Sequence, residues 1–214
     1  MTGKHLVIIL ICAAAAAIPA SAKDAGKEKS DAKAWPVITY GAEWSYAATF
    51  CSSYHQNFYS SEGSMVDIRK TRFGLKSNGE MNLHVGANLG KMWNLSLYAG
   101  YTGVGKYHHA IPVSFRLTRF YGQNPMQDRW LSFMELGSGV ALHKKHSAML
   151  GAKLGGGYRV SLGRLAKLDI IASFRLSYSN PDRIIHYDQD IPAESINRNN
   201  AFSTAFTIGL GITL

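Results

Sequence analysis

The sequence predicts an all-β fold, an eight-stranded antiparallel up-and-down transmembrane β-barrel, and three observations lead to it. Charged residues make up only 17% of the 214 residues, against about 25% in typical soluble domains. Glycine is frequent, with 21 residues, and aromatic residues make up 11%. Apolar and polar residues alternate along most of the chain, with the charges on one side of the alternation. The mean hydropathy of −0.08 is too low for a bundle of transmembrane helices.

The amino-terminal residues predict a secretory signal peptide. Lys4 precedes an apolar run over residues 6–18, and Ala20 and Ala22 supply the small residues of a cleavage site. A spanning helix needs about 20 apolar residues, so this run is too short to be one. We therefore expect residues 1–22 to direct Sec export and to be removed.

The rest of the chain divides into a spacer and the barrel. Residues 23–35 are charged and rich in alanine without an apolar period, so we expect a flexible periplasmic spacer. The barrel then occupies residues 36–214. Cys51 is the one cysteine that follows the signal peptide, so no intrachain disulfide can form.

The first predicted strand, residues 38–50, sets the pattern for the others. Its even positions are apolar or aromatic and its odd positions are small or polar. Because successive side chains of a strand point to opposite faces, this strand has one apolar face and one polar face. Membrane-spanning strands need about 9–11 residues. The alternation recurs in seven further segments: 81–90, 95–101, 111–117, 130–142, 150–162, 168–178 and 202–214.

The charges of these segments lie on the polar faces, and the apolar faces carry none. The polar faces hold Glu43, Arg116, Glu135, Lys153, Arg159, Asp169 and Arg175, with His84 on the same side. A soluble barrel would turn the charged face to water, whereas a membrane barrel turns the apolar face to lipid. The remaining polar-face residues are mostly small, as the crowded interior of an eight-stranded barrel requires. The sequence therefore favours a barrel in the outer membrane of a diderm bacterium.

The connections predict the topology. Long polar connections, above all residues 51–79 and 179–200, alternate with short ones such as residues 163–166. Bacterial barrels have long extracellular loops and short periplasmic turns, so we expect the two longest connections outside the cell. The sequence leaves open whether residues 62–79 add a further hairpin beyond the barrel. This topology places three tryptophans at the periplasmic interface: Trp35, Trp93 and Trp130.

Several of these segments resemble a known family. They read YGAEW (40–44), LSLYAGYTG (95–103), IPVSFR (111–116), DRW (128–130) and FTIGLGITL (206–214). The chain resembles the small eight-stranded outer-membrane β-barrels of the OmpX and OmpA-transmembrane-domain kind, and is similar to the "outer membrane protein β-barrel domain" family. The resemblance implies the fold and the location, since these families share no catalytic motif.

The buried charges predict a structural network rather than an open pore. An unpaired buried charge costs several kcal/mol, so we expect the lumen charges to pair and to fill the barrel. The function predicted is a structural or surface-interaction role carried by the extracellular loops. A narrow solute or ion channel is the alternative.

A second alternative is loop-borne binding of a metal or haem, because histidines gather in the predicted outer loops. The weak candidates for metal ligands are His108, His109, His143 and His146. Their spacing is not diagnostic, so we predict no metal site and no cofactor. We also predict no catalytic residue, since no nucleophile and base are arranged on neighbouring strands.

The expected partners follow from the location. Outer-membrane lipid and lipopolysaccharide would meet the basic loop residues, and the barrel-assembly machinery would insert the chain. An extracellular ligand of unknown identity would bind the loops. The location also accounts for the formal charge of +9, so we expect no nucleic-acid binding, and we expect a monomer.

Overall fold

The computed structural model describes residues 37–104, 108–122, 124–141, 148–163, 166–180 and 191–214. The predicted signal peptide and spacer lie outside the described residues, so their boundaries stay predictions. Among the described residues, no helix is long and apolar enough to cross a membrane.

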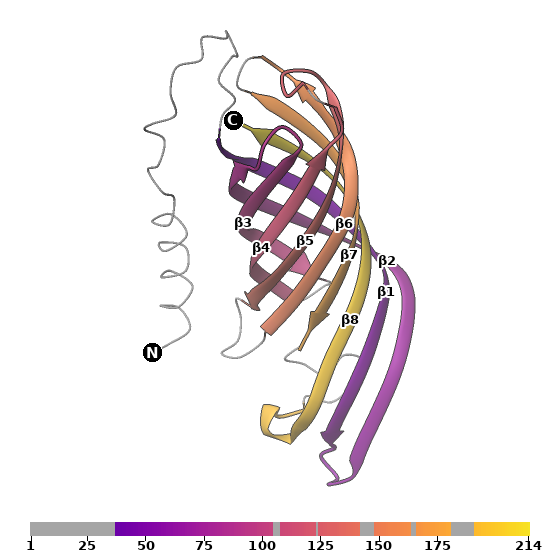
Figure 1. The fold of residues 1–214 in the computed structure, drawn as a ribbon. Helices are drawn as coiled ribbons and strands as arrows, with labels where there is room; N and C mark the ends of the chain where they lie inside the picture. The colour runs from indigo at the N-terminus through magenta and orange to yellow at the C-terminus, as the bar shows by residue number, and fades with distance from the viewer. Residues whose placement is uncertain (1–36, 105–107, 123, 142–147, 164–165, 181–190) are drawn as a thin grey trace, which may run out of the picture. The chain divides into compact units, whose positions relative to one another are not determined.

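Eight antiparallel strands form a closed barrel, as Figure 1 shows. Each strand pairs with the next along the chain, and β8 pairs with β1 to close the ring. A turn of 3-10 helix, η1 (Ala193–Ser195), precedes the last strand. The predicted fold class is confirmed. The strands are β1 (Ile38–Tyr59), β2 (Met65–Asn88), β3 (Trp93–Val104), β4 (His108–Phe120), β5 (Arg129–Ala141), β6 (Ala148–Ser161), β7 (Lys167–Ser179) and β8 (Ile196–Thr213).

The two faces of the barrel wall differ as the alternation predicts. Leu154, on the outer face of β6, is 67% exposed, whereas its neighbour Lys153 is buried in the lumen. Arg116 of β4 is only 4% exposed. A closed wall with an apolar outside and a charged inside is stable only when lipid surrounds it, because water would otherwise meet the apolar belt.

Aromatic side chains mark one rim of this belt. Trp93 begins β3, and Trp130 of β5 packs edge-on against Tyr158 with ring centroids 5.1 Å apart. Interfacial tryptophans and tyrosines are typical of membrane barrels. The β2–β3 connection at residues 89–92 lies at the same end of the barrel, opposite the long hairpin of β1 and β2, so we assign this rim to the periplasm. Trp35 lies outside the described residues.

The prediction of a loop over residues 51–79 is wrong. β1 and β2 stay paired from the barrel to a turn at residues 60–64, where Gly63 adopts a φ of 77°. β8 also pairs with β1 beyond the barrel, as far as the pair Phe58–Ile196. In Figure 1 these three strands continue past the ends of the others.

We call this part the extension, and define it as residues 51–59 of β1, 65–79 of β2 and 196–200 of β8. The predicted loop over 179–200 therefore also ends in a strand, while its residues 181–190 lie outside the described residues. The extension is a sheet because its backbone groups are paired across three strands, which a free loop could not achieve.

A register shift between Thr49 and Cys51 separates the barrel part of β1 from the extension. One additional residue on β1 relative to β8 reverses which positions face inward. Thr49 is buried on the inner side before the shift, whereas Ser52 and Gln56 are buried on that side after it. β1 thus runs through both regions, but odd-numbered residues face inward before the shift and even-numbered residues face inward after it.

Candidate functional site

The middle of the lumen is organised by one arginine. Arg116 of β4 donates to Glu43 of β1 through Nη1 at 2.5 Å and Nη2 at 3.0 Å. Its Nε donates to Glu135 of the neighbouring β5 at 2.8 Å. The guanidinium also lies 4.0 Å from the ring centre of Tyr98 and 4.3 Å from that of Phe133. Because β1 and β4 lie apart in the strand order, the Arg116–Glu43 pair ties the barrel across its lumen.

A second cluster lies towards the extracellular end. Glu80 of β2 accepts from the Lys153 ammonium of β6, and from Nη1 of Arg175 of β7 at 2.9 Å. Asn82 donates to the same carboxylate at 2.7 Å. Lys153 Nζ lies 3.3 Å from Glu135 and so joins this cluster to the first. The joined set contains three carboxylates and three cations, and its formal charges cancel.

A third cluster closes the periplasmic end of the lumen. Arg159 of β6 binds Asp169 of β7 through two hydrogen bonds of 2.6 Å each. Thr213 of β8 lies within 3.3 Å of both partners. The guanidiniums of Arg159 and Arg129 lie over the ring of Phe120, at 4.3 Å and 3.9 Å. This layer is built from β4 to β8, so it braces one half of the wall.

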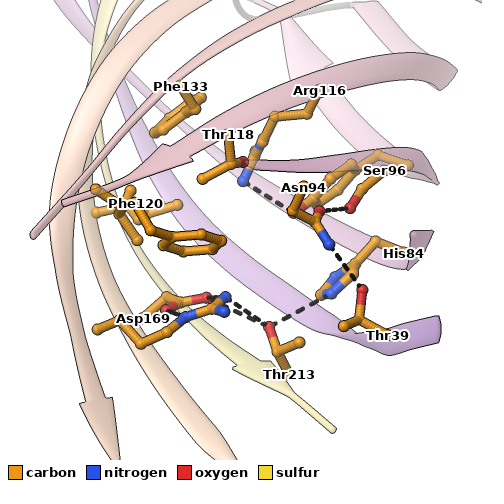
Figure 2. Close-up of a pocket in the computed structure, with 14 residues that line it drawn as sticks. Thr39, His84, Asn94, Ser96, Arg116, Thr118, Phe120, Phe133, Asp169 and Thr213 are labelled. Atoms are coloured by element: carbon orange, nitrogen blue, oxygen red, sulfur yellow. Dashed lines mark hydrogen bonds and ion pairs between the residues drawn. The ribbon is translucent and has the colours of Figure 1, made fainter. Parts of the chain in front are cut away.

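His84 lies between the central and periplasmic clusters, beside a small cavity shown in Figure 2. Its ring stacks on Tyr98 with centroids 4.8 Å apart, and its Nε2 lies 3.5 Å from Thr213 Oγ1. The cavity measures about 20 Å³, room for about one water molecule. A second cavity of about 30 Å³ lies beside Glu80 and Lys153. Both spaces are of the size of a water molecule.

Seven of the eight residues predicted for the lumen are buried. The eighth, Asp169, is half-buried and binds Arg159. The sequence analysis missed Glu80, because the predicted strand began at Met81. Glu80 lies two and four positions before Asn82 and His84, so alternation places it on the same face, and this was the available signal. Tyr98 and Arg129 were also missed. Both alternate with outward residues, Leu97 and Trp130, so the alternation was the available signal for their inward positions.

The predicted histidine candidates do not form a described metal centre. His109 of β4 is stacked on Tyr101 of β3, with its Nδ1 2.5 Å from the phenol oxygen. His108 lies in the same strand, while His143 and His146 lie outside the described residues. Within the described part of the chain, no group of three or more histidine, cysteine or acidic side chains is placed to hold a metal ion.

The extension has its own contacts, and both of its faces mix polar and apolar side chains. On the outer face, His55 Nε2 lies 2.9 Å from Asp67 Oδ1, and the hydroxyls of Ser53 and Thr71 are 2.9 Å apart. On the inner face, Phe58 is fully buried, between its register partners Val66 and Ile196. The outer face also exposes Phe73 and Leu75, and the inner face also buries Gln56, so the extension has no continuous apolar belt like that of the wall.

No protein-family model matches the sequence, and no curated protein matches it. Among solved structures, 17 chains match. The outer membrane protein OprG from Pseudomonas aeruginosa has a TM-score of 0.49 at 10% identity, covering 83% of this chain and 96% of that chain. Neisserial surface protein A has a TM-score of 0.40 at 10% identity, covering 80% and 95%. The outer membrane protease OmpT from Escherichia coli has a TM-score of 0.35 at 9% identity, covering 83% and 97%.

These similarities carry no information about ligand or activity, and the class of the protein follows from its own architecture. The ring of eight strands is closed, its outer face is an apolar belt, and its interior holds paired charges. Closed barrels of this kind satisfy every backbone group without water and are the β-structures that span membranes. The chain is an eight-stranded β-barrel protein of the bacterial outer membrane.

Proposed function

We propose that this protein is a non-catalytic surface-interaction protein, in which the barrel holds the distal part of the extension outside the cell. We define the distal part as residues 53–59 of β1, 65–68 of β2 and 196–200 of β8. One observation carries the proposal: three adjacent strands continue beyond a lumen that the Arg116–Glu43 pair crosses. β1 has 22 residues and β2 has 24, whereas β3 to β7 have 12 to 14.

The length of the extension supports a role outside the membrane. The ten residues that follow Thr49, up to Tyr59, add about 33 Å of strand at about 3.3 Å per residue. Its outer face offers hydrogen-bonding groups in a fixed arrangement, since His55, Asp67, Ser53 and Thr71 bind one another across the strands. Binding residues held on a rigid scaffold lose little conformational entropy when a partner docks.

The narrow-channel alternative has less support. A permeating solute would have to displace Arg116 from Glu43 and Glu135, and removing one partner of such a buried pair costs about 3–5 kcal/mol. The two described cavities, of about 20 and 30 Å³, have different lining residues. Recordings in planar bilayers separate the two roles, because a channel gives discrete conductance steps and the proposed role gives none.

Site-specific photo-crosslinking on intact cells tests the surface role directly. A benzophenone amino acid at Asn57, on the outer face of the extension, should form adducts with protein or polysaccharide. The same probe at Leu154, in the apolar belt, should form adducts with lipid alone. Lipid adducts alone at both positions, or conductance steps from the purified protein, would contradict the proposal.

A further inference from the structure

We propose that the open edge of β2, residues 69–76, is a docking site for an extended segment of another protein in which acidic and apolar residues alternate. This segment would join the extension as a further strand beside β2. The inference rests on the proposed function, since the partner must reach the extension from outside the cell. It assigns a different surface, the strand edge rather than the outer face of the distal part.

The first observation is the edge itself. β2 pairs with β3 only from Glu80 to Asn88, so among the described strands residues 65–79 have β1 as their one neighbour. In Figure 1, β2 is the outermost strand of the extension. Residues 69–76 are exposed throughout. An edge of this kind is a template for a further strand, because backbone groups along it point away from the sheet.

Backbone hydrogen bonds identify the residues that face the edge. In an antiparallel pair, alternate residues of each strand bond to the same neighbour. Ser60 N–H donates to the Ser64 carbonyl oxygen at 2.8 Å, at the turn that joins β1 to β2. At the other end of β2, Asn88 N–H donates to the Val37 carbonyl oxygen at 2.8 Å. Even-numbered residues therefore bond to β1, and the odd-numbered residues of the segment direct their N–H and C=O groups to the edge: Arg69, Thr71, Phe73 and Leu75.

The side chains of the edge are sorted by face. Phe73 and Leu75 are 81% and 77% exposed, the two largest values among the large apolar side chains of the described residues. Both lie on the outer face by alternation, which places Lys70, Arg72 and Lys76 on the inner face. No carboxylate of the described residues lies within 4.0 Å of these three cations. One face of the edge thus offers apolar contact and the other offers positive charge.

The chemistry of the partner follows from these two faces. An added strand continues the pleat of the sheet, so its side chains alternate between the same faces. Its outward residues would lie beside Phe73 and Leu75, and apolar side chains there would cover them. Its inward residues would lie beside Lys70 and Arg72, where carboxylates form opposite-charge cross-strand pairs. Main-chain hydrogen bonds give such a strand its affinity, and the alternating side chains give it specificity.

A second copy of this chain is a poor partner for the same edge. Antiparallel self-pairing centred on Phe73 would place Lys70 opposite Lys76 twice, and like charges directly opposite destabilise a sheet. An acyl chain would cover Phe73 and Leu75 but has no groups to bond with the backbone at the edge. Lysines and arginines at an edge also discourage strand pairing in general. If that were their whole role here, no extended segment would bind.

The experiment follows amide hydrogen exchange by NMR in the full mature protein, refolded in lipid nanodiscs. The probe is a peptide of about nine residues in which valine and glutamate alternate. In the free protein the amides of Lys70 and Arg72 should exchange slowly because they bond to β1, whereas those of Thr71 and Phe73 should exchange fast. Saturating peptide should slow exchange at Thr71 and Phe73 by about tenfold or more, while the amides of Lys70 and Arg72 stay unchanged.

Variants separate the charge from the backbone bonds. Lys70→Gln/Arg72→Gln should weaken binding of the valine–glutamate peptide about 3- to 30-fold, the range expected for two opposite-charge cross-strand pairs. The matched control is Lys91→Gln/Arg119→Gln, two exposed cations at the periplasmic rim, which should change the affinity less than about twofold. Thr71→Pro removes an N–H at the edge, where proline is tolerated, and should abolish binding. The unboiled gel shift of all variants checks that the barrel is folded.

Two further peptides test the alternation. A valine–lysine peptide, and a peptide with the valines and glutamates in two separate blocks, should each bind about tenfold more weakly or less well still. Equal binding of the valine–lysine and valine–glutamate peptides would overturn the proposal. Unchanged exchange at Thr71 and Phe73 with saturating peptide would also overturn it, and so would protection that rises with protein concentration alone. None of these outcomes alters the adducts expected at Asn57, so the proposed function is tested separately.

Discussion

The barrel wall and the distal part of the extension are made from the same strands, but their outer faces differ in polarity. In the wall, Leu154 faces outward and Arg116 is buried inside. In the extension, His55 and Asp67 pair on the outer face and Phe58 is buried on the inner face. β1 contributes to both regions, and the register shift at Thr49 and Cys51 lies between them.

This difference indicates that the surrounding medium, rather than the strand itself, determines which face of the sheet is apolar. Lipid cannot hydrogen-bond, so the wall turns apolar side chains outward and must neutralise its charges inside. Water solvates polar groups, so the extension can leave them outside. The comparison therefore predicts that equivalent substitutions in the two regions have unequal effects.

The largest effect is expected in the lumen. Arg116→Met leaves Glu43 and Glu135 without their shared cation and should lower the free energy of unfolding by about 3–5 kcal/mol. Arg119→Met, three residues along the same strand, removes an exposed cation stacked at 5.5 Å on Trp93, worth about 0.5–1 kcal/mol. Urea unfolding in lipid vesicles, followed by tryptophan fluorescence, measures both. Equal losses would mean that the lumen charges are solvated individually.

The next effect tests the outer faces against each other. Leu154→Arg places a charge in the apolar belt and should cost about 2–4 kcal/mol near the midplane of the bilayer. Thr71→Arg, on the outer face of the extension, should stay within about 0.5 kcal/mol of the unmodified protein because water solvates the charge. The same unfolding assay applies, and a silent Leu154→Arg would contradict the orientation of β6.

A smaller effect distinguishes tight from loose packing inside the wall. A methyl group on Gly155 would lie 2.4 Å from Ser173 Cβ and 2.5 Å from the Ala172 carbonyl oxygen, whereas on Gly151 the nearest atom is 3.9 Å away. Gly155→Ala should therefore cost about 1–3 kcal/mol through overpacking, and Gly151→Ala close to nothing. Similar unfolding midpoints for the two variants would show that β6 and β7 separate easily.

The smallest effect is expected at the surface pair of the extension. Asp67→Asn weakens the contact with His55. The two side chains, His55 and Asp67, are 25% and 44% exposed, so the free energy of unfolding should fall by less than about 1 kcal/mol. Hydrogen exchange of the amides of residues 53–59 should rise while the barrel strands stay protected. Faster exchange throughout the barrel would mean that the two regions unfold together.

The barrel could be predicted from the sequence because lipid enforces a strict alternation, as in residues 38–50 and 202–214. The extension could not, because its polar outer face removes the contrast between faces: residues 52–57 read SSYHQN. The register shift at Cys51 also interrupts the period. The alternation of side chains along each strand placed the lumen charges on one face. The Arg116–Glu43 contact across the lumen could not be predicted, because it depends on the closure of the barrel and on the register of its strand pairs.

The most direct test of the account is a depth profile along β1, the strand that runs through both regions. Nitroxide labels are placed one at a time in a Cys51→Ser background at outward positions 46, 48, 53, 55 and 57, and at inward position 47, in lipid vesicles. We expect labels at 46 and 48 to collide mainly with oxygen, and labels at 53, 55 and 57 to collide mainly with a soluble nickel chelate. The label at 47 should be reached little by either reagent. Oxygen-dominated collisions at 53–57, or nickel-dominated collisions at 46 and 48, would contradict the change from an apolar outer face in the wall to a polar outer face in the distal part of the extension.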